Sequence, residues 1–422
     1  MGFSVTLALL LWNCLSYFQW VPAIPIGTQY RSTIAVSQSI PPITIQFNIF
    51  AMCFAFFADL SVLFSIWFFY LIAILEIGML NQVGISASGG AGGATWAVKA
   101  QHFGGFWVFV LWGFWVARHH LSDVIGKAFG RRPHVDDSDE LFSYRTAIIG
   151  LGGGLAYIGF WLNQTGMTLD VVSMFLAVTL LLYVGVARIV AETGMVFLDL
   201  PVNSNEFTVV AMGSSNLSSS NLTALGLGHA IAHNHRGMGL SSLIHSLKVA
   251  DSVVRGKKGL FGVIASTMVI TFIVTIGYAV YVGSTGTGAH NVAAMNVSAF
   301  YDQIVTWQSN ATEMTNVELY FLSIGGLITS GLLFMHYRFP WWPLHPIGYT
   351  VAYAEILVLE IASIFLVWLI KWLLLKIGGI ELYRKTQPIV FGVLLGYAAG
   401  VAISFAVDFV WFPNGAHGIH NW

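Results

Sequence analysis

Long apolar runs recur along the whole chain, and they constrain the fold more than any other feature of the sequence. A helix that crosses a bilayer needs about 20 mostly apolar residues. Nine runs meet or approach this length: residues 3–21, 60–80, 104–118, 145–163, 170–192, 260–282, 317–337, 352–375 and 387–412. The run 43–57 has the length of a further half-helix. The sequence therefore predicts an all-α polytopic membrane protein with eight to ten transmembrane helices, in which residues 1–422 form a single integral membrane domain.

The composition of the chain agrees with a bilayer as its solvent. Charged residues make up 9% of the sequence, whereas soluble domains carry roughly 25%. A formal net charge of -1 does not favour nucleic acid as a partner. Cys14 and Cys53 both lie in apolar runs, so we expect neither a disulfide framework nor a thiolate metal site.

Lysine and arginine residues predict the orientation of the helices, because short cytoplasmic loops carry an excess of both. The segments 118–145 and 193–258 contain several basic residues, and we expect both to be cytoplasmic loops. The segment 284–316 contains no lysine or arginine and is expected to face outward. Near the C-terminus this scheme places Lys376 and two further basic residues outside, unless the chain breaks or re-enters within residues 338–358.

The stretch FMHYRFPWWPLHPIGYT, from Phe334 to Thr350, falls on this conflict and concentrates prolines, tryptophans and histidines. Proline removes a backbone donor, so a helix breaks there and leaves carbonyl groups for other partners. Broken helices near the midplane present such groups to polar substrates in secondary transporters. We therefore expect Arg338, Trp342, His345 and Glu355 to line a substrate path. The alternative is a plain helix end, because tryptophans also mark bilayer interfaces.

Arg188 and Glu192 form the best intramembrane ion pair that the sequence predicts. They are four residues apart on one helix face, where they can pair in a low dielectric. Ionisable groups inside spanning helices are costly and often mark functional positions. We expect this pair to act in coupling or gating, with Glu192 as a protonatable group. A static clamp between helices is the alternative.

Histidines in GHAIAHNHRG raise the question of a metal site. His229 and His233 are one helical turn apart, and His235 follows closely, which would suit a shared ion. The chain has no HxxHH cluster and none of the GxSxG, HExxH or P-loop patterns. A histidine-dependent metalloenzyme is therefore the least favoured alternative, and we expect no catalytic residues, metal or cofactor.

Several quoted stretches together resemble an uncharacterised bacterial membrane family that is distantly related to the oligopeptide transporter superfamily. They are ADLSVLFSIWFFYLI, ARIVAETG, WWPLHPIGYTVAY, WLIKWLLLKIGGIELYRK and PIVFGVLLGYAAG. The resemblance covers most of residues 20–412, and WPLHPIG is its most specific part. Members of the superfamily tend to be longer, with more spanning helices before the matched region.

The resemblance implies a function in transport rather than catalysis. It implies a secondary transporter of the bacterial cytoplasmic membrane, driven by protons, for a small polar substrate such as a peptide or a metal chelate. The alternative is a non-transporting subunit of a larger membrane assembly, with lipid, other membrane proteins or a second copy of the chain as partners.

Overall fold

The computed structural model describes residues 1–24, 31–85, 93–138, 140–195, 198–232, 240–253, 259–285, 302–412 and 417. These residues are mainly helical, with one antiparallel β-hairpin. The elements are α1 (Gly2–Tyr17), β1 (Ser32–Ile34), β2 (Ile43–Ile45), α2 (Ile49–Ala55), α3 (Leu60–Val83), α4 (Ala94–Ala128), α5 (Tyr144–Gln164), α6 (Leu169–Thr193), α7 (Ser204–Met212), a 3-10 turn (Ser214–Asn216), α8 (Ser219–Leu227), α9 (His229–Ala232), α10 (Leu240–Val253), α11 (Leu260–Thr285), α13 (Asn316–Arg338), α14 (Pro346–Val351) and α15 (Glu355–Trp411).

The helical class predicted from the apolar runs is confirmed. In the part of the chain that the structure describes, six helices are long and apolar enough to cross a membrane: α3, α5, α6, α11, α13 and α15. Each of the nine apolar runs overlaps a helix, and the run 43–57 contains the short helix α2. These spans indicate an integral membrane protein. The β-hairpin was not predicted.

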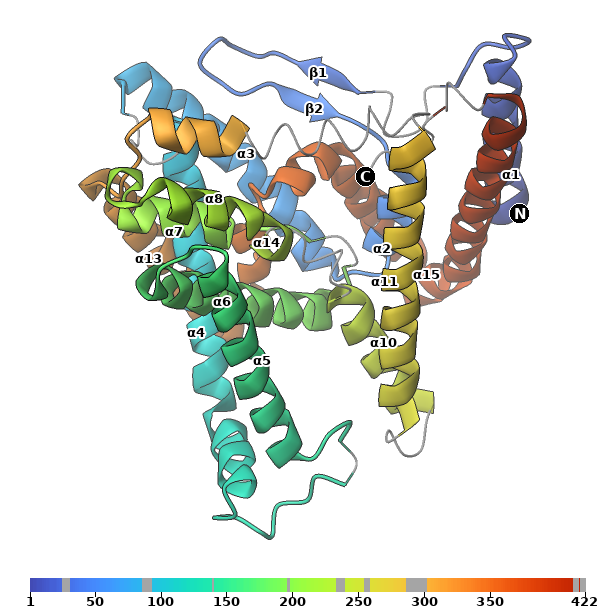
Figure 1. The fold of residues 1–422 in the computed structure, drawn as a ribbon. Coiled ribbons are helices and arrows are strands. Elements are labelled where there is room, and N and C mark those ends of the chain that lie inside the picture. Colours follow the sequence, from blue (N-terminus) through green and yellow to red (C-terminus); the bar gives the residue numbers. More distant parts are fainter. Residues whose placement is uncertain are drawn as a thin grey trace.

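The longest element, α15, consists of two antiparallel helices. Gly379 interrupts it with φ 60° and ψ -158°, a left-handed conformation that glycine adopts without a steric penalty. Lys371 on one side of this break and Tyr383 on the other both reach the carbonyl oxygen of Phe56, at 3.0 and 3.3 Å. The chain therefore turns back on itself at Gly379, and the second half packs beside α1 (Figure 1).

The short helix α14 runs alongside α3 in the same direction. The backbone N–H of His345 donates to Ser65 Oγ at 2.7 Å. One turn further along both helices, the rings of Phe69 and Tyr349 meet edge to face at 5.1 Å. Helix α14 therefore begins at the same end of the bundle as α3.

The first half of α15 then runs antiparallel to α3. Phe64 contacts Trp368, with ring centroids 5.6 Å apart, whereas Trp67, further along α3, contacts the earlier residue Phe365 at 5.3 Å. Because α14 is parallel to α3 and α15 is antiparallel to it, residues 338–358 contain a break and a reversal of direction. Arg338 and the end of this first half thus lie at the same end of the bundle.

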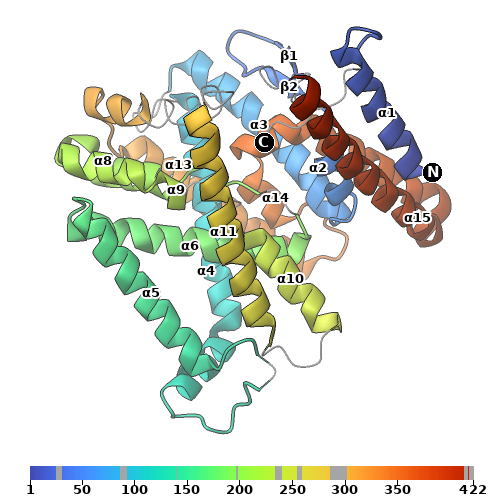
Figure 2. The same cartoon turned by 45° about the vertical axis from the view of Figure 1, so that its right-hand side comes forward.

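The helices do not all run side by side. Figures 1 and 2 show α6 crossing α4 and α11 at a steep angle, so α6 lies across the bundle. The connection between α4 and α5 projects at one end, and the β-hairpin lies at the other (Figure 1). In α11 no residue of the most apolar window is buried, and in α5 only 6% of it is. Both helices are therefore largely exposed on the surface that the described residues form.

Helices α4 and α13 form the closest helix pair of the core. A Cβ atom on Gly104 would lie 2.0 Å from the carbonyl oxygen of Leu322, and one on Gly325 would lie 1.7 Å from that of Gln101. Small residues at such positions let two backbones approach closely, which is how helices gain packing energy in lipid. The core they share with α3, α6, α14 and α15 surrounds the break described above.

Candidate functional site

The break after α13 is stabilised by its own sequence. Pro346 occupies the first turn of α14, where its missing N–H costs nothing. His345 is the N-cap residue, and its Nδ1 accepts a hydrogen bond from the N–H of Ile347 at 3.2 Å. With its backbone N–H bound to Ser65, His345 is held at both its backbone and its ring.

Other ionisable groups surround His345. Its ring lies 4.5 Å from that of His336, near the end of α13. It is also close enough to Asp59 and Arg188 to interact electrostatically with both. Asp59 is the N-cap of α3, where its carboxylate accepts from Ser61 N at 2.8 Å. The turn between α13 and α14 therefore faces the start of α3 and one side of α6.

Arg188 and Glu192 form the ion pair that their spacing predicts. Arg188 Nε lies 2.7 Å from Glu192 Oε1. Its Nη1 also donates to the carbonyl of Phe109 at 3.0 Å, and the guanidinium stacks 4.2 Å above the Phe109 ring. The pair thus joins α6 to α4 and leaves Glu192 half-exposed. Lys248 of α10 donates to the carbonyl of Ala191 at the same end of α6, at 3.0 Å.

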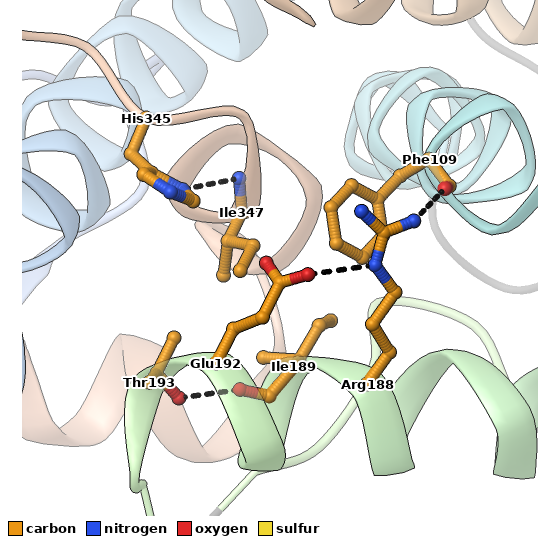
Figure 3. Close-up of polar contacts among 7 residues, drawn as sticks. All are labelled: Phe109, Arg188, Ile189, Glu192, Thr193, His345 and Ile347. Carbon is orange, nitrogen blue, oxygen red and sulfur yellow. Dashed lines mark hydrogen bonds and ion pairs between the residues drawn. The ribbon is translucent and has the colours of Figure 1, made fainter. Parts of the chain in front are cut away.

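The two groups of residues singled out in the sequence meet in space. Figure 3 shows His345 and the Arg188–Glu192 pair grouped around Ile347, although they come from elements about 150 residues apart. The remaining members of the expected substrate path are more peripheral. Arg338 and Glu355 are exposed, and Trp342 is half-buried in a small apolar cluster with Tyr349.

Glu360 carries a buried carboxylate, five residues after the expected path residue Glu355. Glu360 is 8% exposed, and its Oε1 accepts from Asn48 Nδ2 at 2.9 Å and from Gln46 Nε2 at 3.2 Å. The segment before α2 supplies both amide donors to Glu360. The spacing of residues along the helix carries no information about such distant partners.

Lys371 is a buried cation that sequence reasoning missed. It is 6% exposed and donates to the carbonyl oxygens of Phe56 and Ala58, at 3.0 and 2.6 Å. These carbonyls follow the last turn of α2, where a helix leaves acceptors unpaired and favours a positive charge. The available signal was a lysine inside the apolar run WLIKWLLL.

A further set of buried polar side chains lies where α14 crosses α4 and α13. His102 Nδ1 pairs with the carbonyl of Tyr349 at 2.7 Å, and Gln101 Nε2 donates to Glu76 at 3.0 Å. Several buried atoms here have no hydrogen-bond partner among the described residues: Gln101 Oε1, His102 Nε2, Thr329 Oγ1 and the Tyr349 hydroxyl. Such a group is unusual in a protein core, where buried polar atoms are normally paired.

The histidine-rich segment gives no support to a metal site within the described residues. His229 Nδ1 pairs with Asn205 Nδ2 at 3.2 Å. His233 and His235 lie outside the described residues. Among the residues that are described, no three or more His, Cys, Asp or Glu side chains are placed to hold an ion.

Comparison with known proteins identifies the family but no activity. No curated protein and no solved structure matches the chain. A family model described as a family of unknown function matches residues 1–416, which is nearly the whole chain. The uncharacterised family expected from the sequence is thus identified, while its distant relation to oligopeptide transporters stays a prediction. The chain belongs to DUF6785, a family of unknown function.

Proposed function

We propose that the protein is a secondary transporter, similar to oligopeptide transporters, that uses protons to move a small polar substrate across a bacterial cytoplasmic membrane. The observation that carries this proposal is the convergence of His345, Arg188 and Glu192 at a broken helix. In known secondary transporters, substrates bind where discontinuous helices expose their ends inside the membrane.

Two discontinuities supply such helix ends. One separates α2 from α3 at residues 56–59, and the other lies on both sides of α14, at residues 339–345 and 352–354. They lie side by side, because Ser65 in the second turn of α3 binds the backbone of His345. Non-helical backbone at membrane depth is stable only where protein or a water-filled cavity surrounds it, so this region suits a path for polar molecules.

The charges around His345 favour a substrate that carries both signs. Arg188 offers a guanidinium, and Asp59 and Glu192 offer carboxylates on the opposite sides of the turn. A short peptide has a terminal ammonium and a terminal carboxylate, and a metal chelate likewise combines both charges. We assign Arg188 and Glu192 to gating or coupling, and Arg338, Trp342 and Glu355 to the more exposed part of the path.

Uptake by the purified protein in sealed liposomes tests this function. An imposed pH gradient should drive accumulation of labelled di- and tripeptides or of a labelled iron chelate. Arg188→Ala and Glu192→Gln should abolish gradient-driven uptake. Arg118→Ala should leave it intact, since Arg118 is exposed on α4 and its guanidinium contacts Trp115 of the same helix. Uptake that ignores the gradient, or that survives both site variants, would refute the proposal.

A subunit role is the second candidate, and α11 is the observation in its favour. The most apolar window of this helix has no buried residue, so a partner protein could cover it as readily as lipid. Stable copurification of unrelated membrane chains in stoichiometric amounts, together with no uptake of any substrate tested, would favour this role.

A further inference from the structure

Glu360 has one satisfied and one unsatisfied carboxylate oxygen. Oε1 accepts from both Gln46 and Asn48, whereas Oε2 is buried and has no hydrogen-bond partner among the described residues. The nearby hydroxyl of Ser363 is already engaged, since it donates to the carbonyl of Gln46 at 3.0 Å. An ionised carboxylate half-satisfied in this way is costly, and protonation removes that cost.

Glu360 also lines a small apolar cavity of about 40 Å³. The described residues around it are otherwise uncharged, and include Ala51 and Ala55 of α2 and Leu63 of α3. An apolar space of this kind offers no hydrogen-bond partner to an ionised carboxylate. The neutral acid loses less on burial than the carboxylate does, so this environment favours the protonated form.

A hydrogen-bonded chain leads from Glu360 to the surface. Gln46 donates to Glu360 through Nε2 and accepts from Arg31 Nε, at 3.4 Å, through Oε1. Arg31 is exposed beside the β-hairpin. Two other titratable groups face this region: Tyr397, close enough to interact electrostatically, and Lys371, about three turns further along α15.

Hydrogen bonds of Asn48 also link the Glu360 carboxylate to the first turn of α2. Asn48 donates to Glu360 through Nδ2, while its Oδ1 caps α2 by accepting from Phe50 N and Ala51 N at 3.1 and 3.2 Å. Its own backbone N–H donates to Ser363 Oγ at 3.0 Å. One side chain thus joins the carboxylate to the first turn of the half-helix.

We propose that Glu360 is a proton-binding site and that its protonation loosens the half-helix α2. In this step a proton from water at the β-hairpin end converts the carboxylate to a carboxylic acid, with no other bond formed or broken. The amide groups of Gln46 and Asn48 then lose their charged acceptor, and their hydrogen bonds to Oε1 weaken. The inference rests on the proposed function for its role in transport, where Glu360 would bind the coupling proton.

Infrared difference spectroscopy of the purified protein in lipid tests the proton site without any substrate. As the pH is lowered, the wild type should gain a carboxylic C=O band from a buried group. Glu360→Gln should remove this band, and Glu360→Asp should shift it. Glu381→Gln, an exposed position on the second half of α15, should keep it. A spectrum unchanged by both Glu360 variants would overturn the proposal.

Native Cys53 reports on α2 itself, because it is a buried residue of that helix. In a Cys14→Ala background at fixed pH, Glu360→Gln should speed maleimide labelling of Cys53 by about tenfold, the factor expected when one charge-assisted hydrogen bond is lost. Equal labelling rates in Glu360→Gln, the control Glu381→Gln and the parent would overturn the coupling to α2. If Glu360 takes up a proton but the protein transports no substrate, only the proposed function is refuted. If the protein transports substrate but Glu360 shows no protonation in the infrared spectra, only this inference is refuted.

Discussion

Replacing Lys371 by methionine tests how the half-helix α2 is held in place. The ammonium of Lys371 donates to the carbonyls of Phe56 and Ala58 just after α2, and it lies 4.8 Å from the centre of the Tyr383 ring. Methionine fills a similar volume but donates no hydrogen bond. The substitution therefore removes the donor with little change in packing.

The expected loss of stability follows from two opposing effects. Each hydrogen bond to a charged donor contributes about 1.5–3 kcal/mol, so two such bonds contribute about 3–6 kcal/mol. Removing the ammonium also removes its desolvation cost, which is several kcal/mol for a buried ion. The Phe56 carbonyl keeps the Tyr383 hydroxyl as a donor, whereas the Ala58 carbonyl loses the ammonium, at a cost of about 1–3 kcal/mol. Because the hydrogen-bond and desolvation contributions of the ammonium largely cancel, we expect a net destabilisation of about 1–3 kcal/mol.

Reversible unfolding in mixed micelles, followed by tryptophan fluorescence, measures this difference. The matched control is Lys376→Met, on the same helix. Lys376 is exposed and its ammonium lies 4.6 Å from the centre of the Trp372 ring, a contact that contributes about 0.5–1 kcal/mol. Equal losses for the two variants, or a Lys371→Met protein as stable as the parent, would show that Lys371 does not stabilise α2.

Four further substitutions can be measured in the same unfolding assay. Gly348→Ala places a Cβ atom 2.3 Å from Ser65 Cβ and 2.8 Å from its backbone carbon, and should cost about 1–3 kcal/mol; Gly331→Ala in α13 meets no atom within 4 Å and should be neutral or gain up to about 1 kcal/mol. Equal effects of these two would contradict the close approach of α14 to α3. Asn48→Ala removes the cap of α2 and should cost about 1–2 kcal/mol, so an unchanged stability would contradict the capping role. Tyr383→Phe removes only a 3.3 Å bond to Phe56 and should cost less than about 1 kcal/mol; a loss as large as that of Lys371→Met would assign the stabilisation to the tyrosine.

The apolar runs predicted the helices well because length and hydropathy alone decide whether a segment can span a bilayer. The break within residues 338–358 was also predictable, since proline chemistry and the distribution of basic residues pointed to the same place. The β-hairpin was not, because Ser32–Ile34 and Ile43–Ile45 are too short to give a period-two pattern.

The candidate site was only partly predictable, for a physical reason. Arg188 and Glu192 share a helix face, so their spacing was sufficient to predict the pair. The environments of Glu360 and Lys371 depend on Asn48 and Phe56, which are 312 and 315 residues away along the chain. Helical spacing carries no information about partners at such separations, so an exposed glutamate was ranked above a buried one.

The same long separations have a consequence for how the protein is made. A lysine at the centre of a helix raises the free energy of its insertion into the membrane by about 2.5–3.5 kcal/mol. The first half of α15 carries Lys371 and Glu360, and both find their partners around α2. The first half of α15 should therefore insert stably into the bilayer only after the N-terminal segment is in place. In a chain synthesised without residues 43–59, this helix should be poorly inserted and should be degraded.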